Sequence, residues 1–219
     1  MAASVKLIEN PTDAQVEETV QLLCQAFEGD ATIPGMTGDN PELIPAFFRS
    51  MLRAGALEGS YYVVDDDAGK ILTIGLWFGP GQEMFSRQGW PSVEAQRAAG
   101  WNDFFAALSP EAQHWWNAVF HKKHGDMIQT HLGPDYTDSW FANIVATHPA
   151  HQRNGYASML IKTVCARAEK ENKRATLATQ SEDNTRFYQG LGFKLLGMTD
   201  IPVPDGSWND YVLRWETSL

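Results

Sequence analysis

The sequence predicts an α/β protein, in which a mixed central sheet is flanked by helices and a helical insertion separates the third and fourth strands. Runs rich in β-formers alternate with helix-patterned segments along the whole chain, as such a sheet with packed helices requires. Between about residues 80 and 138 the β pattern stops and helical spacing replaces it. The 219 residues are enough for one domain with a substantial core, so we expect a single domain over 1–219.

The first part of the chain predicts the order β-α-α-β-β. The expected elements are a strand over 4–8, a helix over 10–30, a loop over 30–41, a second helix over 42–59 and a hairpin over 60–80. Thr12 is the candidate N-cap of the first helix, and Gln15 stands three residues on, as in a capping box. Pro45 falls in the first turn of the second helix. Asp and Gly residues mark the turn of the hairpin.

The insertion carries two aromatic stripes at helical spacing. They consist of Trp101, Phe104, Phe105 and Leu108, and of Ala112, Trp115, Trp116, Val119 and Phe120. Ser109 and Pro110 suit the N-cap and first position of the second helix. We expect most of these side chains to form the core of the insertion. Some of them, together with Trp77, Phe78 and Trp90, could instead wall a pocket for a second substrate.

The last part predicts β-α-β-α-β-β. The expected elements are a strand over 140–147, a helix after 158, a strand over 175–180, a short helix over 184–192 and a closing hairpin over 193–215. The long helix places Tyr156, Met159, Leu160, Thr163 and Val164 on one face. Gly192 is expected to stop the short helix.

Composition excludes several classes of protein. The net charge is −10, from 17 basic and 27 acidic residues, which argues against nucleic-acid binding because phosphate backbones need a positive surface. We find no apolar run that suits a signal peptide or a membrane span. The two cysteines, Cys24 and Cys165, both fall in helical pattern and suit a reducing compartment. A cytoplasmic protein is the expectation.

The stretch HQRNGYAS, His151 to Ser158, lies between a predicted strand and a long predicted helix. The first N–H groups of a helix lack internal partners and favour an anion, such as phosphate. Gly155 and Ala157 are small enough to let a phosphate approach, and Arg153 adds a cation. The spacing fits neither a P-loop nor a dinucleotide fingerprint. The residues alone leave two interpretations open, an ordinary start of a helix and an anion site.

The same stretch carries a resemblance to a known family. Gln152-Arg153-Asn154-Gly155-Tyr156-Ala157 resembles the (Gln/Arg)-x-x-Gly-x-(Gly/Ala) acetyl-CoA motif of the GNAT N-acetyltransferases. The strand before it and the stretch NTRFYQGLGF are similar to the same family, and the resemblance runs from about Trp140 to Trp215. Within the family, the sequence looks most like the puromycin N-acetyltransferase group, which shares a helical insertion before the fourth strand.

The resemblance implies acetyl-CoA as cosubstrate. In this family the fourth and fifth strands part, and the pantetheine arm lies between them like an added strand. Carried over, the main chain of Val145, Ala146 and Thr147 pairs with that arm, and the N–H groups of Arg153, Asn154, Gly155, Tyr156, Ala157 and Ser158 hold the pyrophosphate. The resemblance also implies direct acetyl transfer to an amine, and we expect a small-molecule acceptor. A protein N-terminus or lysine, or non-catalytic acyl-CoA binding, are the alternatives.

Tyr188 occupies the family's tyrosine position and is the candidate general acid for the leaving thiolate. Its alternative role is that of a core aromatic beside Phe187 and Leu191. Asn184 either contacts the coenzyme or caps the short helix. The sequence predicts no metal site and leaves a monomer or homodimer open.

The sequence does not identify a general base. By position the candidates are Glu28, Asp30 and His148, for which surface or capping roles are expected. Asn143 lies on the predicted fourth strand but is no base. His114, His121 and His124 fall in the insertion, and we expect them to be solvated.

Overall fold

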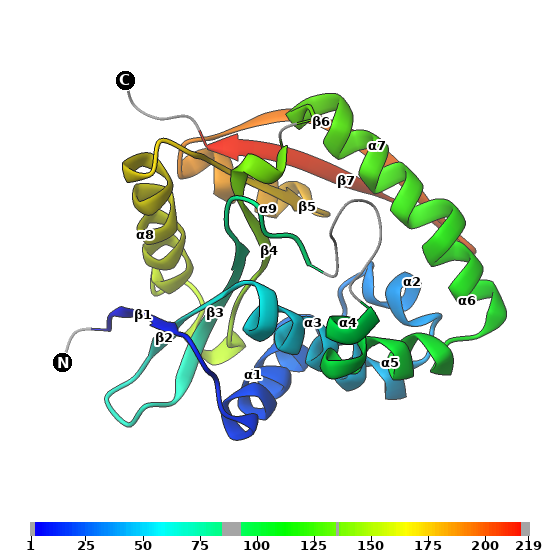
Figure 1. The fold of residues 1–219 in the computed structure, drawn as a ribbon, viewed down its shortest axis with the longest axis horizontal. Helices are drawn as coiled ribbons and strands as arrows, with labels where there is room; N and C mark the ends of the chain where they lie inside the picture. Colours follow the sequence, from blue (N-terminus) through cyan, green and yellow to red (C-terminus); the bar gives the residue numbers. More distant parts are fainter. Residues whose placement is uncertain (1–2, 85–92, 135, 216–219) are drawn as a thin grey trace.

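The computed structural model describes residues 3–84, 93–134 and 136–215, and it contains a seven-stranded mixed sheet in the order β1-β2-β3-β4-β5-β7-β6 (Figure 1). All neighbouring strands pair antiparallel except β4 and β5, which pair parallel. The mixed sheet, the flanking helices and the helices before the fourth strand confirm the predicted fold class. Trp90, a candidate pocket wall, lies outside the described residues.

The first part of the chain contains β1 (Val5–Ile8), α1 (Asp13–Ala26), α2 (Ile33–Thr37), a 3-10 turn (Pro41–Leu43), α3 (Ile44–Glu58), β2 (Ser60–Asp65) and β3 (Ile71–Phe78). The capping box is confirmed, because the Thr12 hydroxyl accepts from the Gln15 N–H while the Gln15 side chain accepts from the Thr12 N–H. The loop predicted over 30–41 is wrong in part, since it contains α2. Gly35 lets this short helix pack on Trp208, whose ring would lie 2.6 Å from a β-carbon at that position.

The insertion contains α4 (Val93–Ala99), α5 (Trp101–Ala107), α6 (Pro110–Trp115), a π-helical segment (Trp116–Phe120), α7 (His121–Leu132) and a 3-10 turn (Tyr136–Asp138). The Ser109 hydroxyl caps α6 by accepting from the Ala112 N–H at 3.2 Å, as predicted. Two adjacent tryptophans join the insertion to the rest of the fold. Trp115 Nε1 donates to Pro202 O at 2.6 Å, and Trp116 Nε1 donates to Met36 O at 2.9 Å.

The remaining elements are β4 (Ser139–Thr147), a 3-10 turn (Pro149–His151), α8 (Tyr156–Lys170), β5 (Arg174–Thr179), α9 (Glu182–Gly190), β6 (Phe193–Val203) and β7 (Gly206–Trp215). They follow the predicted order. Gly192 takes a φ of +101° just past the end of α9, which a residue with a β-carbon adopts only with strain.

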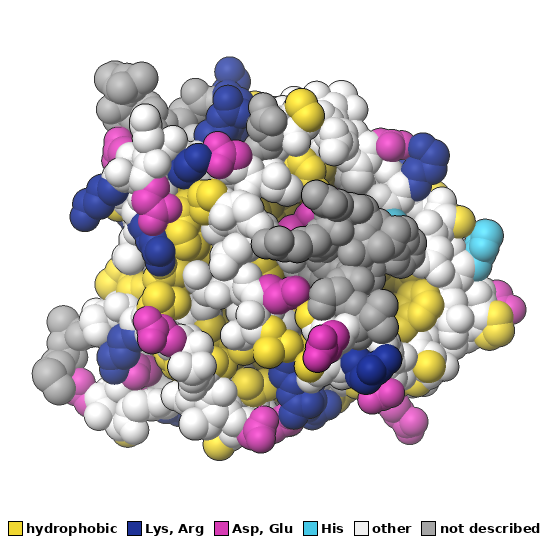
Figure 2. Space-filling view, viewed as in Figure 1, with side chains coloured by type: hydrophobic (Ala, Val, Ile, Leu, Met, Phe, Trp, Pro, Cys, Tyr) yellow, Lys and Arg dark blue, Asp and Glu magenta, His cyan; other side chains and the backbone are white. Residues whose placement is uncertain are grey.

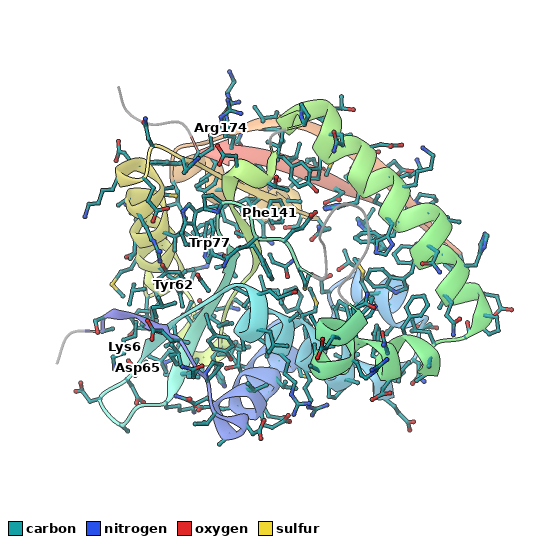
Figure 3. All side chains as sticks on the ribbon, viewed as in Figure 1. Lys6, Tyr62, Asp65, Trp77, Phe141 and Arg174 are labelled. Carbon is teal, nitrogen blue, oxygen red and sulfur yellow. The ribbon has the colours of Figure 1, made fainter. Side chains whose placement is uncertain are left out.

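Alternate residues of the strands build two cores, one on each face of the sheet. On β3, Ile74 and Leu76 belong to the core under α1 and α3, whereas Trp77 belongs to the core under α8. Helices α8 and α9 cover one face, and α1, α3 and the insertion cover the other (Figure 1). Trp77 and Phe141 lie on neighbouring strands in the middle of the sheet (Figure 3).

Charged side chains of both signs are interspersed over the face seen in Figure 2. At the β1–β2 edge of the sheet, Lys6 Nζ lies 2.6 Å from Asp65 Oδ2 (Figure 3). Within the described ranges, no helix is both long enough and apolar enough to cross a membrane.

Candidate active site

Strands β4 and β5 pair over only part of their length. The parallel register joins Ser139–Ala142 to Arg174–Leu177 and goes no further, although β4 continues to Thr147. On its other side, β4 shifts register with β3 between Ala142 and Ile144, which leaves Asn143 as the extra residue of a bulge. A bulge bends its strand, so the edge of β4 beyond Ala142 lies apart from β5.

The register with β3 decides which main-chain groups of β4 face this gap. His148 N–H donates to Leu72 O at 2.9 Å, and Ala146 pairs with Ile74 in the same register. In an antiparallel ladder every second residue bonds to the same neighbour, so Ala146 directs its N–H and C=O to β3. Val145 and Thr147 therefore direct theirs to the gap. The register therefore argues against a main-chain contact of Ala146 with a group in the gap, and Val145 and Thr147 stay as candidates for that contact.

The turn after β4 leads into the open N-terminus of α8. Gly155 is the N-cap with φ 81° and ψ 3°, and no side chain caps the helix. A β-carbon added at Gly155 would meet nothing within 4 Å. No side chain therefore caps the first N–H groups of α8, and the space beside Gly155 is open, which is an arrangement that suits an anion.

Side chains of the turn hold its shape internally. Asn154 Nδ2 donates to the carbonyl oxygens of His151 and Gln152, at 3.0 and 3.2 Å, and Gln152 Nε2 donates to Thr147 O at 3.3 Å. Arg153 takes a φ of +64°, an uncommon backbone conformation for a residue other than glycine. The exposed Arg153 is therefore available as a cation beside the N-terminus of α8.

Tyr188 lies in the core between α8, α9 and the sheet. Its ring centroid is 5.6 Å from that of Phe193 and 5.3 Å from that of Phe187, and only 8% of the residue is exposed. Burial raises the pKa of the Tyr188 phenol, so the group stays protonated and can donate a hydrogen bond. The aromatic packing expected under the alternative role is present, and it does not exclude the proton-donor role.

Asn184 is not the cap of α9. The N-cap is Ser181, whose hydroxyl accepts from Asn184 N–H at 3.0 Å. This corrects the capping interpretation of Asn184, which lies inside the first turn with an exposed side chain.

Residues 111–195 match the family model described as the Acetyltransferase (GNAT) domain. This part of the chain, from α6 to the start of β6, is therefore similar to the GNAT acetyltransferase domain. The match supports an acetyltransferase, and acetyl-CoA is the acyl donor that such a domain implies. No curated protein matches the sequence.

Solved structures share the GNAT fold over nearly the whole chain. A histone acetyltransferase HPA2 and related acetyltransferase from Corynebacterium glutamicum has a TM-score of 0.64 at 21% identity, covering 100% of this chain and 98% of that one. A polyamine N-acetyltransferase from Drosophila melanogaster, which forms N-acetylagmatine, has a TM-score of 0.57 at 12% identity, covering 98% and 100%. The ribosomal-protein-S18-alanine N-acetyltransferase from Escherichia coli has a TM-score of 0.53 at 11% identity, covering 100% and 96%.

Several other candidates have structural roles in this GNAT fold. Asp30 Oδ1 accepts from the Thr32 N–H and hydroxyl, and His148 Nδ1 accepts from the Ala150 N–H. Trp77 and Phe78 are 0% and 2% exposed, so they do not wall an open pocket. The two cysteines are free. Among the described residues, no cluster of three or more His, Cys, Asp or Glu could hold a metal ion.

One expectation for the histidines is wrong. His124 Nδ1 lies 2.6 Å from Asp210 Oδ2, and the Asp210 side chain is 0% exposed. Gln180 Nε2 donates to the other carboxyl oxygen at 2.9 Å. The pairing joins residues 86 positions apart, so helical spacing could not reveal it. The signal in the sequence is that Asp210 stands between Trp208 and Val212 at alternate positions of the predicted last strand, where the two neighbouring positions are apolar.

Proposed function

We propose that this protein transfers the acetyl group of acetyl-CoA directly to a primary amine of a small molecule. The observation that carries the proposal is the parting of β4 from β5 beyond Ala142 and Leu177, next to the uncapped N-terminus of α8. A gap between two strands takes an extended arm carrying amide groups, and a helix N-terminus takes phosphate. Acetyl-CoA carries both of these groups, joined in that order.

Each part of acetyl-CoA has a proposed partner in the chain. The amides of the pantetheine arm pair with the main chain of Val145 and Thr147, and the pyrophosphate accepts from the N–H groups of residues 153–158. Arg153 adds a positive charge, and the exposed Asn184 side chain contacts the coenzyme from α9. A shallow hollow runs from Gly155 along the outer face of α8 to Lys162 and Ala166, and it offers room for the rest of the nucleotide. Sequence reasoning did not single out Lys162.

Tyr188 supports the departure of the thiol. When the amine attacks the thioester carbonyl, the C–S bond breaks and the sulfur needs a proton or a hydrogen bond. Because burial raises the pKa of Tyr188 above that of a free phenol, complete proton transfer to a thiolate is uphill. Tyr188 therefore acts as a hydrogen-bond donor whose proton moves with the bond breaking rather than before it.

For the acceptor we propose a class of compounds rather than one molecule. The resemblance to the puromycin N-acetyltransferase group favours a small amine such as an antibiotic, a toxin or a metabolite, and the likeness to a polyamine N-acetyltransferase fits the same class. The likeness to an enzyme acting on a ribosomal protein keeps a peptide acceptor as the second candidate. We propose a cytoplasmic monomer or homodimer, consistent with the two free thiols.

A thiol-release assay tests the proposal. The protein is incubated with acetyl-CoA and a panel of polyamines, arylalkylamines, aminonucleoside antibiotics and N-terminal peptides. We expect release above hydrolysis with at least one small amine, and mass spectrometry should find the acetyl group on its nitrogen. Preference for peptides selects the second candidate. Tight acetyl-CoA binding without any transfer would instead select a non-catalytic acyl-CoA-binding protein.

A further inference from the structure

We propose that His124, held by the buried carboxyl group of Asp210, is the general base that takes the proton from the acceptor amine. This inference rests on the proposed function, because it assigns a residue to the same reaction. His124 lies on α7, a helix of the insertion, and Asp210 lies on β7 of the central sheet.

The environment of His124 orients its ring. Nδ1 faces Asp210 at 2.6 Å, and the ring stacks on Phe120 with centroids 5.4 Å apart and an interplanar angle of 18°. The side chain is 27% exposed while its carboxyl partner is 0% exposed, and Nε2 is the ring nitrogen that does not face Asp210. With the proton on Nδ1, donated to Asp210, Nε2 presents a lone pair.

Asp210 is an unfavourable residue to bury for stability alone. Withdrawing a carboxylate from water costs several kcal/mol, and well-packed apolar side chains in place of a buried ion pair are often as stable or more so. Its neighbours on the same face of β7 are apolar, namely Trp208 and Val212. A buried carboxyl with two donors, His124 and Gln180, resembles the support that a catalytic imidazole needs.

The pair lies beside the gap between β4 and β5. Thr179, the last residue of β5, pairs with Tyr211, so Asp210 is level with Gln180, just beyond the end of that strand. Strands lie about 4.8 Å apart, and an arm lying as an extra strand beside β5 would be about 10 Å from β7 by that spacing. His124 lies over the face of the sheet on this side of the gap, because Ile128, one turn further along α7, belongs to the same apolar cluster as Phe141 of β4 and Ala178 of β5. In the proposed complex Nε2 takes the proton of an amine at the thioester, directly or through one water.

The step balances as follows. The nitrogen lone pair of the neutral amine attacks the thioester carbonyl carbon and forms the C–N bond. The N–H proton passes to Nε2 of His124, the C–S bond breaks, and the sulfur leaves as a thiol with a proton from Tyr188. Solvent then carries the proton from His124 and restores that of Tyr188. The products are the N-acetylamine and coenzyme A.

The test compares two acceptors of different basicity. His124→Asn keeps a donor near the position of Nδ1 for Asp210 but removes Nε2, and Asp210→Asn keeps the shape of the carboxyl group. His114→Gln is the matched control, because His114 is exposed on α6. Each variant is assayed with an alkylamine and with a weakly basic arylamine, and acetyl-CoA affinity is measured by calorimetry.

We expect His124→Asn to lower kcat with the alkylamine about 100-fold or more, the usual contribution of a general base, and less than about tenfold with the arylamine. The protonated intermediate of an arylamine is acidic enough to lose its proton to water. Asp210→Asn should show the same dependence on the acceptor with a smaller loss. Acetyl-CoA affinity should stay unchanged in both.

Transfer by His124→Asn within threefold of the wild type, or equal losses with both amines, would overturn the role of His124 while leaving the proposed function intact. No transfer by the wild type to any amine would overturn both. If the two variants do not fold, carbethoxylation of His124 in the wild type, located by mass spectrometry, replaces them. Modification should then abolish transfer to the alkylamine without affecting acetyl-CoA binding, and retained transfer would count against His124.

Discussion

Gly155→Glu should abolish acetyl-CoA binding, because it places a negative side chain where the pyrophosphate is proposed to lie. The position has open space around it, with no atom within 4 Å of an added β-carbon. The substitution therefore meets no steric obstacle in the protein itself. Its cost to folding comes from the backbone, whose φ of 81° is disfavoured for a residue with a β-carbon by about 1–2 kcal/mol.

The cost to binding is larger than the cost to folding. A carboxylate about 5 Å from one phosphate charge, at an effective dielectric constant of about 20, repels it by about 3 kcal/mol. That energy corresponds to a loss of affinity of more than about 100-fold. The loss of the helix N-terminus as an anion site adds to it in the same direction.

Calorimetric titration with acetyl-CoA measures the effect. The chain offers a matched control in Gly100, which is the N-cap of α5 with φ 82° and ψ 12° and likewise has no atom within 4 Å of an added β-carbon. Gly100→Glu should lose similar folding stability and keep the affinity of the wild type. A folded Gly155→Glu protein that binds acetyl-CoA within threefold of Gly100→Glu would refute the phosphate site.

Three further predictions follow from burial and packing. Tyr188→Phe should lower kcat at least tenfold, the lower part of the range for acid catalysis, with unchanged acetyl-CoA affinity in calorimetry. Gly55→Ala should lower the free energy of unfolding by about 1–3 kcal/mol in urea, because a β-carbon there would lie 1.9 Å from a leucine side chain of β3. Gly125→Ala, in a helix position with no atom within 4 Å, should instead raise it by about 1 kcal/mol. Burial raises the pKa of Cys165 to about 12, so at pH 8 this thiol stays protonated and should react with a disulfide reagent far more slowly than the half-buried Cys24.

Each of these has a clear contrary result. Unchanged turnover in Tyr188→Phe would leave Tyr188 a core aromatic only. Equal stability of Gly55→Ala and Gly125→Ala would show that α3 moves away from β3 at little cost. Equal labelling of the two cysteines would mean that the core around Cys165 opens on the time scale of the reaction.

Local signals in the sequence were sufficient for most of the fold. Thr12 and Gln15 specify the start of α1 because both partners of the capping box lie within one turn. Ser109 and Pro110 do the same for α6. α2 escaped prediction because Pro34 and Gly35 suggest a loop, and its helix is stabilised by contact with Trp208, far along the chain.

In the candidate site, too, some features could be predicted from neighbouring residues and others depend on tertiary contacts. The turn around Gly155 was predictable because the small residue, the strand before it and the helix after it are contiguous. The orientation of the Ala146 main chain could not be predicted, since it depends on the pairing of Ala146 with Ile74 of β3. The contact of His124 with Asp210 also depends on tertiary packing, as neither residue has a neighbour in sequence that indicates the other.

The two tryptophan hydrogen bonds of the insertion bear on how this scaffold could be re-engineered. Trp115 and Trp116 bond to two different elements, one to β6 and one to α2. Replacing the insertion alone by that of another protein, in order to change the acceptor, would therefore break these contacts. A graft would need to bring along α2 and the outer end of β6, or else leave two indole N–H groups in the core without acceptors.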